Sequence, residues 1–303
     1  MHQAGTRPMA AALYMLAGMF VLGFVDNFVG RLAEHIGVWQ FLVLRLLLSA
    51  PLLILAAAMG LGGLRARSWP RVAARGFLMA AGMVFYFGAL AFITLGEALA
   101  GLFTSPIFIL LISALFLGQR IGIWRFLAVA IGFAGVLMVL QPGGEGFSVV
   151  MLLPVCGAVL YALGNIVTRM WCAEESTLVM LAMTFLMQAS IGVLAMMALG
   201  LAGAEAVPGA DGFLTRGWIW SPDASIWPYM AAQVLGSLFG VFCLIRAYQI
   251  GEASYVTVFE YSIMVFGPGF GFLLYGQTLG SLQLLGIALI AAAGLIIALR
   301  SRG

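Results

Sequence analysis

The decisive stretch is VLGFVDNFVGR, residues 21–31, because a second stretch, VLYALGNIVTR at residues 159–169, reads as its copy. Valine, leucine, asparagine, valine and arginine recur at matching positions, and each stretch ends an apolar segment of membrane-spanning length. Such self-similarity indicates an internal duplication. If an odd number of crossings forms one copy, the second copy lies inverted in the membrane, which is an architecture of secondary transporters.

Composition places the chain in the bilayer. Hydrophobic residues make up 64% of the sequence and charged residues only 8%, and the mean hydropathy is +1.13. Soluble domains carry about 25% charged residues. All fourteen basic residues are arginine, and no clustered basic face of the kind that binds nucleic acid is present. We therefore expect an integral membrane protein with membrane lipid as a partner and no nucleic acid.

Ten apolar segments, each about 20 residues long, predict ten transmembrane helices. They lie at 9–31, 37–60, 73–94, 98–118, 123–141, 148–170, 178–201, 227–249, 254–276 and 281–299. The stretch 202–226 is rich in glycine, proline and alanine, and it predicts an irregular loop on a membrane surface. No soluble domain is indicated.

Arginine placement predicts the orientation, because cytoplasmic loops carry an excess of basic residues. With a cytoplasmic N-terminus, only Arg31 and Arg216 fall on the outer side. The cytoplasmic arginines are then Arg7, Arg65, Arg67, Arg71, Arg75, Arg120, Arg125, Arg169, Arg246, Arg300 and Arg302. An even number of crossings brings the C-terminus to the same side.

Further matched stretches support the duplication. LGEA at 95–98 matches IGEA at 250–253, and LGQRIG at 117–122 matches YGQTLG at 275–280. The small-residue runs GFAG at 132–135 and AAAG at 291–294 also correspond. We expect an all-α membrane protein built of two inverted five-helix repeats, at 9–141 and 148–299.

These glycine–glutamate–alanine helix starts, the glycine–glutamine helix ends and Arg45 in the second segment resemble the drug/metabolite transporter superfamily with its EamA-type repeats. The resemblance covers nearly the whole chain. It implies a ten-helix carrier of the bacterial inner membrane with both termini in the cytoplasm and a central cavity lined by both repeats. Characterised members include exporters of amino acids and other metabolites, importers of vitamins such as riboflavin, and nucleotide-sugar carriers.

Isolated charges inside apolar segments are candidate substrate-binding groups, because a charge in mid-bilayer is costly unless it is paired or faces a cavity. Arg45 would bind a carboxylate or phosphate, with Asp26 orienting it or binding a cation; a structural ion pair between the two is the alternative. Glu260 would carry a coupling proton, since burial favours the neutral form of a carboxyl. A permanently protonated, hydrogen-bonded Glu260 is its alternative.

The matched charges suggest two gates. An outer Arg31–Glu97 pair and an inner Arg169–Glu252 pair would break alternately, although a glutamate in the first turn of a helix is favoured by the helix dipole alone. Pro106 and Pro268 interrupt equivalent helices, so we expect them to act as hinges that shape the cavity, or to be static kinks.

Polar and aromatic side chains at cavity depth complete the predicted site, which aromatic walls with a few amide and hydroxyl groups make suitable for an organic solute. These residues would equally be ordinary interhelix packing. The remaining candidates are Asn27, Phe85, Tyr86, Thr104, Ser105, Tyr161, Asn165, Gln233 and Tyr255.

Three function classes follow. A metabolite carrier is favoured, with export of amino acids or related metabolites ahead of import of a vitamin or aromatic heterocycle such as riboflavin, and with protons as a candidate coupling ion. A lipid or head-group flippase is the alternative of another class. An enzyme is not expected, because no cluster of catalytic side chains is present at a membrane face. The spacing of Cys156, Cys172 and Cys243 predicts no metal site, and no cofactor is expected.

Overall fold

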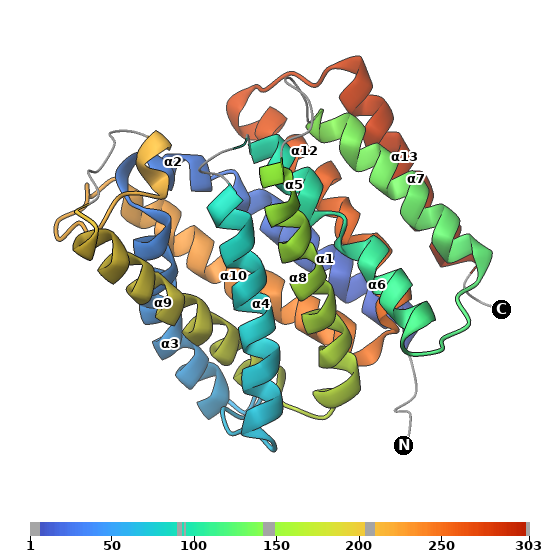
Figure 1. The fold of residues 1–303 in the computed structure, drawn as a ribbon, viewed down its shortest axis with the longest axis horizontal. Coiled ribbons are helices and arrows are strands. Elements are labelled where there is room, and N and C mark those ends of the chain that lie inside the picture. The colour runs from blue at the N-terminus through green and yellow to red at the C-terminus, as the bar shows by residue number, and fades with distance from the viewer. Residues whose placement is uncertain (1–6, 90–92, 94, 142–148, 204–209, 301–303) are drawn as a thin grey trace.

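The computed structural model describes residues 7–89, 93, 95–141, 149–203 and 210–300, with the side chains of 95–97 and 210–211 left out. This part of the chain forms a helical bundle (Figure 1). It contains ten helical spans that are long and apolar enough to cross a membrane. The prediction of an all-α membrane protein with ten spans is confirmed.

The first repeat holds spans one to five, and its first and fourth spans are each made of two helices. Its elements are α1 (Pro8–Asp26), α2 (Val29–His35), α3 (Val38–Ala58), α4 (Trp69–Ala89), α5 (Leu95–Leu102), α6 (Ser105–Leu115) and α7 (Ile123–Leu140).

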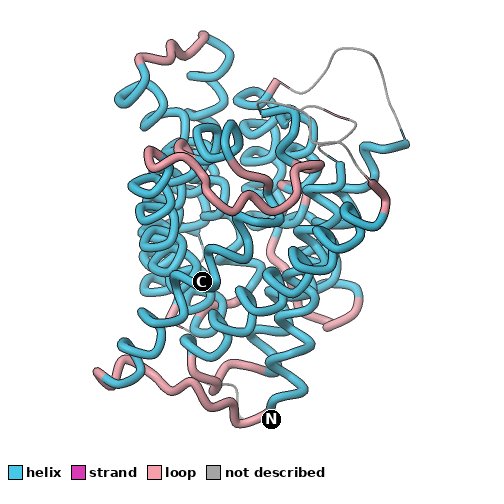
Figure 2. The backbone as a smooth tube through the Cα atoms, turned by 90° about the vertical axis from the view of Figure 1, so that its left-hand side faces the viewer, coloured by secondary structure: helices cyan, strands magenta, loops and turns pink. Residues whose placement is uncertain are grey.

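The second repeat holds spans six to ten, and its ninth span contains a 3₁₀ segment, η3, between two α-helices. Its elements are η1 (Val149–Met151), α8 (Leu152–Trp171), α9 (Thr177–Leu201), η2 (Ala210–Phe213), α10 (Ile226–Ile250), α11 (Ala253–Val256), η3 (Thr257–Ser262), α12 (Ile263–Tyr275) and α13 (Ser281–Arg300). Helices make up most of the backbone, with short loops between them (Figure 2).

Equivalent helices of the two repeats run antiparallel. The fifth and tenth spans, α7 and α13, lie side by side (Figure 1), and a Cβ at Gly135 would lie 2.6 Å from the Gly286 oxygen. Gly132 in turn faces Ala293, one to two turns further along α13. Gly135 lies near the end of α7 and Gly286 near the start of α13, so the two helices point in opposite directions. The repeats are therefore inverted.

Two more helix pairs join the repeats, and exchanging the repeats converts one pair into the other. α1 packs along α10, and α4 packs along α8. Glycines permit both close approaches: a Cβ at Gly82 would lie 2.9 Å from the Gly157 oxygen, and one at Gly18 would lie 2.9 Å from the Gly240 oxygen. Small residues at helix crossings allow backbones to meet in this way within a membrane bundle.

The third span begins four residues before its expected position. The sequence predicts 73–94, whereas α4 spans Trp69–Ala89. The carboxylate of Glu175, from the loop between α8 and α9, accepts the backbone N–H groups of Arg67 and Ser68 just before α4 begins. This distant side chain fixes the backbone immediately before the helix begins.

The long loop before α10 packs onto the end of the bundle where α3 begins. The Trp39 indole donates to the Leu214 carbonyl at 2.8 Å, and the Gln40 side chain exchanges hydrogen bonds with the backbone of Ile219 at 2.8 and 3.0 Å. The short η2 turn lies in this loop, which is otherwise irregular as expected over its described residues.

Candidate functional site

Three spans are interrupted. The first span breaks after Asp26 and the fourth at Phe103–Thr104, while the ninth contains η3. Pro106 lies in the first turn of α6, and because proline has no N–H it cannot donate to the carbonyl of residue 102. Pro268, in contrast, lies within α12, and the irregular turns of that span precede it. Discontinuous helices at a repeat interface are typical of transporter binding sites.

A central cavity of about 220 Å³ lies beside the fourth and ninth spans. Both repeats contribute to its wall. Most of the wall is apolar and rich in sulfur and aromatic groups: Met19, Met79, Met83, Phe87, Phe103 and Phe185. The polar groups are few, and they are Arg45, Ser105, Tyr161, Thr184, Gln188 and Glu260.

Arg45 on α3 is held at the cavity wall by neutral neighbours. Its Nη2 donates to the side-chain oxygen of Gln188, and its guanidinium carbon lies 4.7 Å from the centre of the Phe185 ring and 5.3 Å from that of Phe41. Cation–π contacts of this kind stabilise a guanidinium away from water. Its buried Nε has no hydrogen-bond partner among the described residues. Arg45 is thus oriented by neutral groups, and its Nε donor is unused among the described residues.

Asp26 lies at the end of α1, close enough to Arg45 for the two charges to interact. Among the described residues the two form no direct ion pair. The Asp26 Oδ1 instead accepts from Gln233 Nε2 at 3.2 Å, and the same Nε2 donates to the Val25 carbonyl at 3.2 Å. The side chain of Asp26 is exposed. Gln233 therefore orients this carboxylate.

Glu260 is buried within η3, on the opposite repeat from Arg45. The Tyr248 hydroxyl donates to its Oε1 at 2.6 Å, and the Tyr161 hydroxyl lies 3.5 Å from the same atom. In the part of the chain that the structure describes, no basic side chain forms an ion pair with Glu260. The cavity is thus lined by one basic and one acidic side chain, each held by neutral partners.

The structure brings some of the predicted site residues together and separates others. Four of them line the central cavity: Arg45, Ser105, Tyr161 and Glu260. Asn27 braces the break in the first span, because its Nδ2 donates to the carbonyls of Gly23 at 2.7 Å and Gly267 at 3.1 Å. Tyr86 is buried beside Phe87, and Asn165 is buried without a hydrogen-bond partner among the described residues.

Sequence reasoning missed three polar residues at or beside the cavity. Thr184 and Gln188 lie one helical turn apart on α9 and both face the cavity, a spacing that could have indicated them. Arg75 was assigned to a cytoplasmic helix end. Because α4 begins at Trp69, Arg75 instead lies almost two turns inside the helix and is fully buried.

The contacts of the proposed gate residues include the following. Arg31 pairs with Glu34 at 3.9 Å, and the side chain of Glu97 lies outside the described residues. On the other side of the bundle Glu252 pairs with Arg125 at 2.5 Å. Arg169 donates to the carbonyl of Gln249 at 2.5 Å. Arg169 and Glu252 nevertheless line one cavity.

That second cavity is larger, about 860 Å³, and is rich in arginine. Its charged lining is Arg67, Arg71, Arg120, Arg125, Arg169, Glu174, Glu175 and Glu252. These residues come from the starts of α4, α7 and α11, from the end of α8 and from the loops beside them. The cavity opens at the end of the bundle that the arginine pattern predicts to be cytoplasmic.

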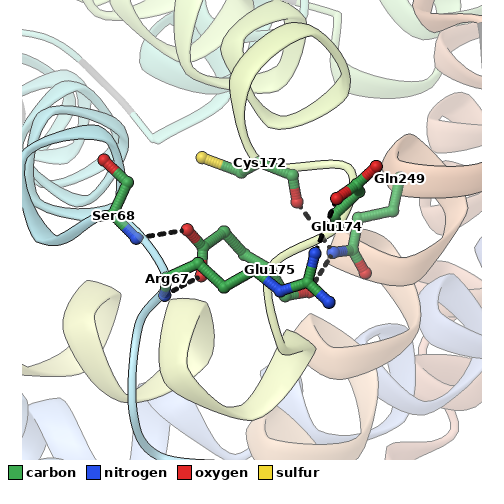
Figure 3. Close-up of polar contacts among 6 residues, drawn as sticks. All are labelled: Arg67, Ser68, Cys172, Glu174, Glu175 and Gln249. Carbon is green, nitrogen blue, oxygen red and sulfur yellow. Dashed lines mark hydrogen bonds and ion pairs between the residues drawn. The ribbon is translucent and has the colours of Figure 1, made fainter. Parts of the chain in front are cut away.

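The loop between α8 and α9 forms hydrogen bonds with residues of both repeats beside this cavity (Figure 3). Gln249 Nε2 donates to the carbonyls of Cys172 at 3.0 Å and Glu175 at 2.8 Å, and Arg67 pairs with Glu174 at 2.6 Å. Burial raises the pKa of the Cys172 thiol to about 11, so this cysteine is a neutral packing group. Among the described residues no cluster of metal-binding side chains occurs.

Comparison with known proteins identifies the family. Residues 9–141 and residues 148–299 each match the model of the EamA-like transporter family. The chain belongs to this family. The EamA repeats thus account for both inverted halves of the bundle, and the resemblance drawn from the sequence is confirmed. Its members are transporters, so the chain is a multi-pass membrane transporter of small metabolites.

Two relatives and one solved structure show which proteins this EamA-like chain is similar to. It is 30% identical to the riboflavin transporter of Rhizobium johnstonii, over 79% of this chain and 73% of the relative. It is 28% identical to the pseudopaline exporter CntI of Pseudomonas aeruginosa, over 77% and 76%. A protein of known crystal structure shares the fold with a TM-score of 0.79 at 20% identity, over 96% of this chain and 98% of that one.

Proposed function

We propose that this EamA-like transporter exports a zwitterionic, amino-acid-type metabolite across the bacterial inner membrane by alternating access. The observation that carries the proposal is the pair of opposite charges in one cavity. Arg45 from the first repeat and Glu260 from the second line the same apolar space, and neither forms an ion pair there among the described residues. A substrate carboxylate would bind Arg45, and its ammonium group would bind Glu260.

The orientation in this proposal has both termini in the cytoplasm, as the arginine bias favours. The arginine-lined cavity then faces the cytoplasm and attracts carboxylates from that side. A relative that is named an exporter supports the same direction. The two repeats, 9–141 and 148–299, would rock about the central cavity, with the breaks near Pro106 and before Pro268 as hinges. Arg169, Glu252 and Arg125 would close the inner side, and Arg31 and Glu97 the outer side.

Glu260 would also carry the coupling proton. Its carboxyl is buried beside two tyrosine hydroxyls and lines the substrate cavity, so binding of a substrate ammonium group would favour release of a proton. Glu260→Gln is then expected to abolish transport driven by a pH gradient. Exchange of substrate for substrate should continue with a higher KM, because the glutamine oxygen still accepts a hydrogen bond from the ammonium group. Transport driven by a pH gradient that persists in Glu260→Gln would contradict the coupling role.

A planar heterocycle of the flavin class is the second candidate substrate. The methionine and phenylalanine wall of the cavity suits stacking against a planar ring, and a relative is named a riboflavin transporter. For such a substrate Arg45, Gln188 and Ser105 would supply hydrogen bonds along the ring edge.

Ligand-induced thermal stabilisation of the purified protein tests the proposal. The panel includes amino acids, S-adenosylmethionine, riboflavin, nucleobases and polyamines. A ligand at about 100 times its dissociation constant adds about 2.7 kcal/mol of stability, which gives a measurable shift of the melting temperature. We expect a zwitterion to stabilise the wild type and to lose this effect in Arg45→Gln. A melting-temperature shift with riboflavin alone would favour the flavin class as substrate. No shift with any ligand of the panel would favour a lipid-linked substrate and a flippase.

A further inference from the structure

A thin layer of buried side chains separates the two cavities. On α4, Arg71 lines the large cavity and Met79 the central one. On α8, Arg169 lines the large cavity and Tyr161 the central one. The residues midway between them, Arg75 and Asn165, lie one turn from each and are fully buried.

Helix α6, in the fourth span, repeats this arrangement. On α6, Ser113 lines the large cavity, Ser105 lines the central one, and Ile109 between them is fully buried. Three helices therefore place a buried residue at the same level. We call Arg75, Ile109 and Asn165 the barrier layer. It lies between residues that line the arginine-lined cavity and residues that line the central cavity.

Arg75 is incompletely satisfied in this layer. Its Nε donates to the Thr168 hydroxyl at 3.0 Å and its Nη1 donates to the Thr184 hydroxyl. Its Nη2 is buried and has no hydrogen-bond partner among the described residues. No acidic side chain in the described part of the chain forms an ion pair with it. A buried guanidinium without an anion is a costly arrangement inside a membrane protein.

Asn165 is unsatisfied beside it. Its Nδ2 and Oδ1 are buried and have no hydrogen-bond partner among the described residues. The two residues are linked through α8. Thr168, which accepts a hydrogen bond from Arg75, lies three residues beyond Asn165 on a neighbouring part of the same helix face. The Tyr161 hydroxyl, one turn earlier on α8, interacts with the Asn165 amide without reaching the geometry of a hydrogen bond. Arg75 Nη2 and Asn165 Nδ2 are thus unused donors in the layer between the two cavities.

We propose that Arg75 and Asn165 form a carboxylate-binding site in the barrier layer, occupied as an anionic group passes between the arginine-lined cavity and the central cavity. Arg75 Nη2 and Asn165 Nδ2 would donate to the two carboxylate oxygens, in the charge-assisted geometry that guanidinium groups favour. The site rests on the proposed function only for the identity of the transported molecule. It explains why a cation is kept where a neutral side chain would pack at lower cost.

The test uses benzoate and benzamide as probes, because they share shape and differ in the charge of one group. Dissociation constants are measured from thermal stabilisation of the detergent-purified wild type, Arg75→Met, Asn165→Leu and Arg45→Gln. Arg65→Met serves as the control, since Arg65 is exposed and lies outside both cavities. Wild type and the control should bind benzoate about tenfold or more tightly than benzamide, the preference expected for a charged hydrogen bond.

Arg75→Met should remove this preference, and Asn165→Leu should reduce it, while neither variant melts below the wild type without ligand. Asn165→Leu keeps the test decisive if Arg75→Met does not fold. A benzoate preference that survives in both variants would overturn the proposal. Survival in both together with loss in Arg45→Gln would assign the anion to the central cavity alone, which overturns the barrier site and leaves the proposed function standing.

Discussion

Glu175 fastens the second repeat to the start of α4, and Glu175→Gln should weaken the whole bundle. The carboxylate accepts the N–H groups of Arg67 and Ser68, both at 2.8 Å, and the side chain is only 7% exposed. Hydrogen bonds to a charged group contribute about 1.5–3 kcal/mol each. Glutamine keeps one neutral acceptor and turns its NH₂ group toward the other N–H, so we expect a loss of about 2–4 kcal/mol.

The adjacent glutamate provides a matched control. Glu174 pairs with Arg67 at 2.6 Å, but the two side chains are 80% and 70% exposed, and exposed ion pairs contribute at most about 1 kcal/mol. The free energy of unfolding is measured by chemical denaturation in detergent for Glu175→Gln and Glu174→Gln under identical conditions. Equal losses in the two variants, or a smaller loss for Glu175→Gln, would refute the claim that the Glu175 carboxylate stabilises the bundle through the backbone before α4.

Two further predictions concern packing and the inner ion pair. Gly82→Ala should lower the melting temperature, because the new Cβ would lie 2.9 Å from the Gly157 oxygen. Gly88→Ala on the same helix meets no atom within 4 Å and should raise stability by up to about 1 kcal/mol through helix propensity. The opposite order of the two melting temperatures would contradict this. The Arg125–Glu252 pair is partly exposed, so a double-mutant cycle should give a coupling of about 0.5–1 kcal/mol. A coupling near zero would show that the 2.5 Å contact contributes nothing to stability.

The fold was largely readable from the sequence because each span is a long apolar run and the duplication leaves matching motifs. The displacement of α4 was not readable. Glu175, which holds the backbone just before its start, belongs to a loop of the other repeat, and local sequence carries no sign of that contact. The same displacement hid Arg75, which a helix beginning at residue 73 would place near the membrane surface.

The candidate site was partly readable. A lone charge in an apolar run is conspicuous, so the sequence indicates Arg45 and Glu260 directly, and both line the central cavity. The neutral partners that hold them, Gln188 and Tyr248, resemble ordinary packing in sequence, since only the meeting of distant helices gives them a role. Pairing of charges was the least readable feature: Glu252 contacts Arg125 because the starts of α7 and α11 meet at the large cavity.

Counterflow in proteoliposomes tests the central claim most directly. Vesicles containing the purified transporter are loaded with the unlabelled zwitterion that stabilises it most, and entry of the labelled compound is followed without any ion gradient. The account predicts transient accumulation of label with the wild type and its loss in Arg45→Gln, with Arg65→Met unchanged. Equal accumulation in wild type and Arg45→Gln would contradict a central site built on Arg45, and no accumulation with the wild type would contradict transport of that class of substrate.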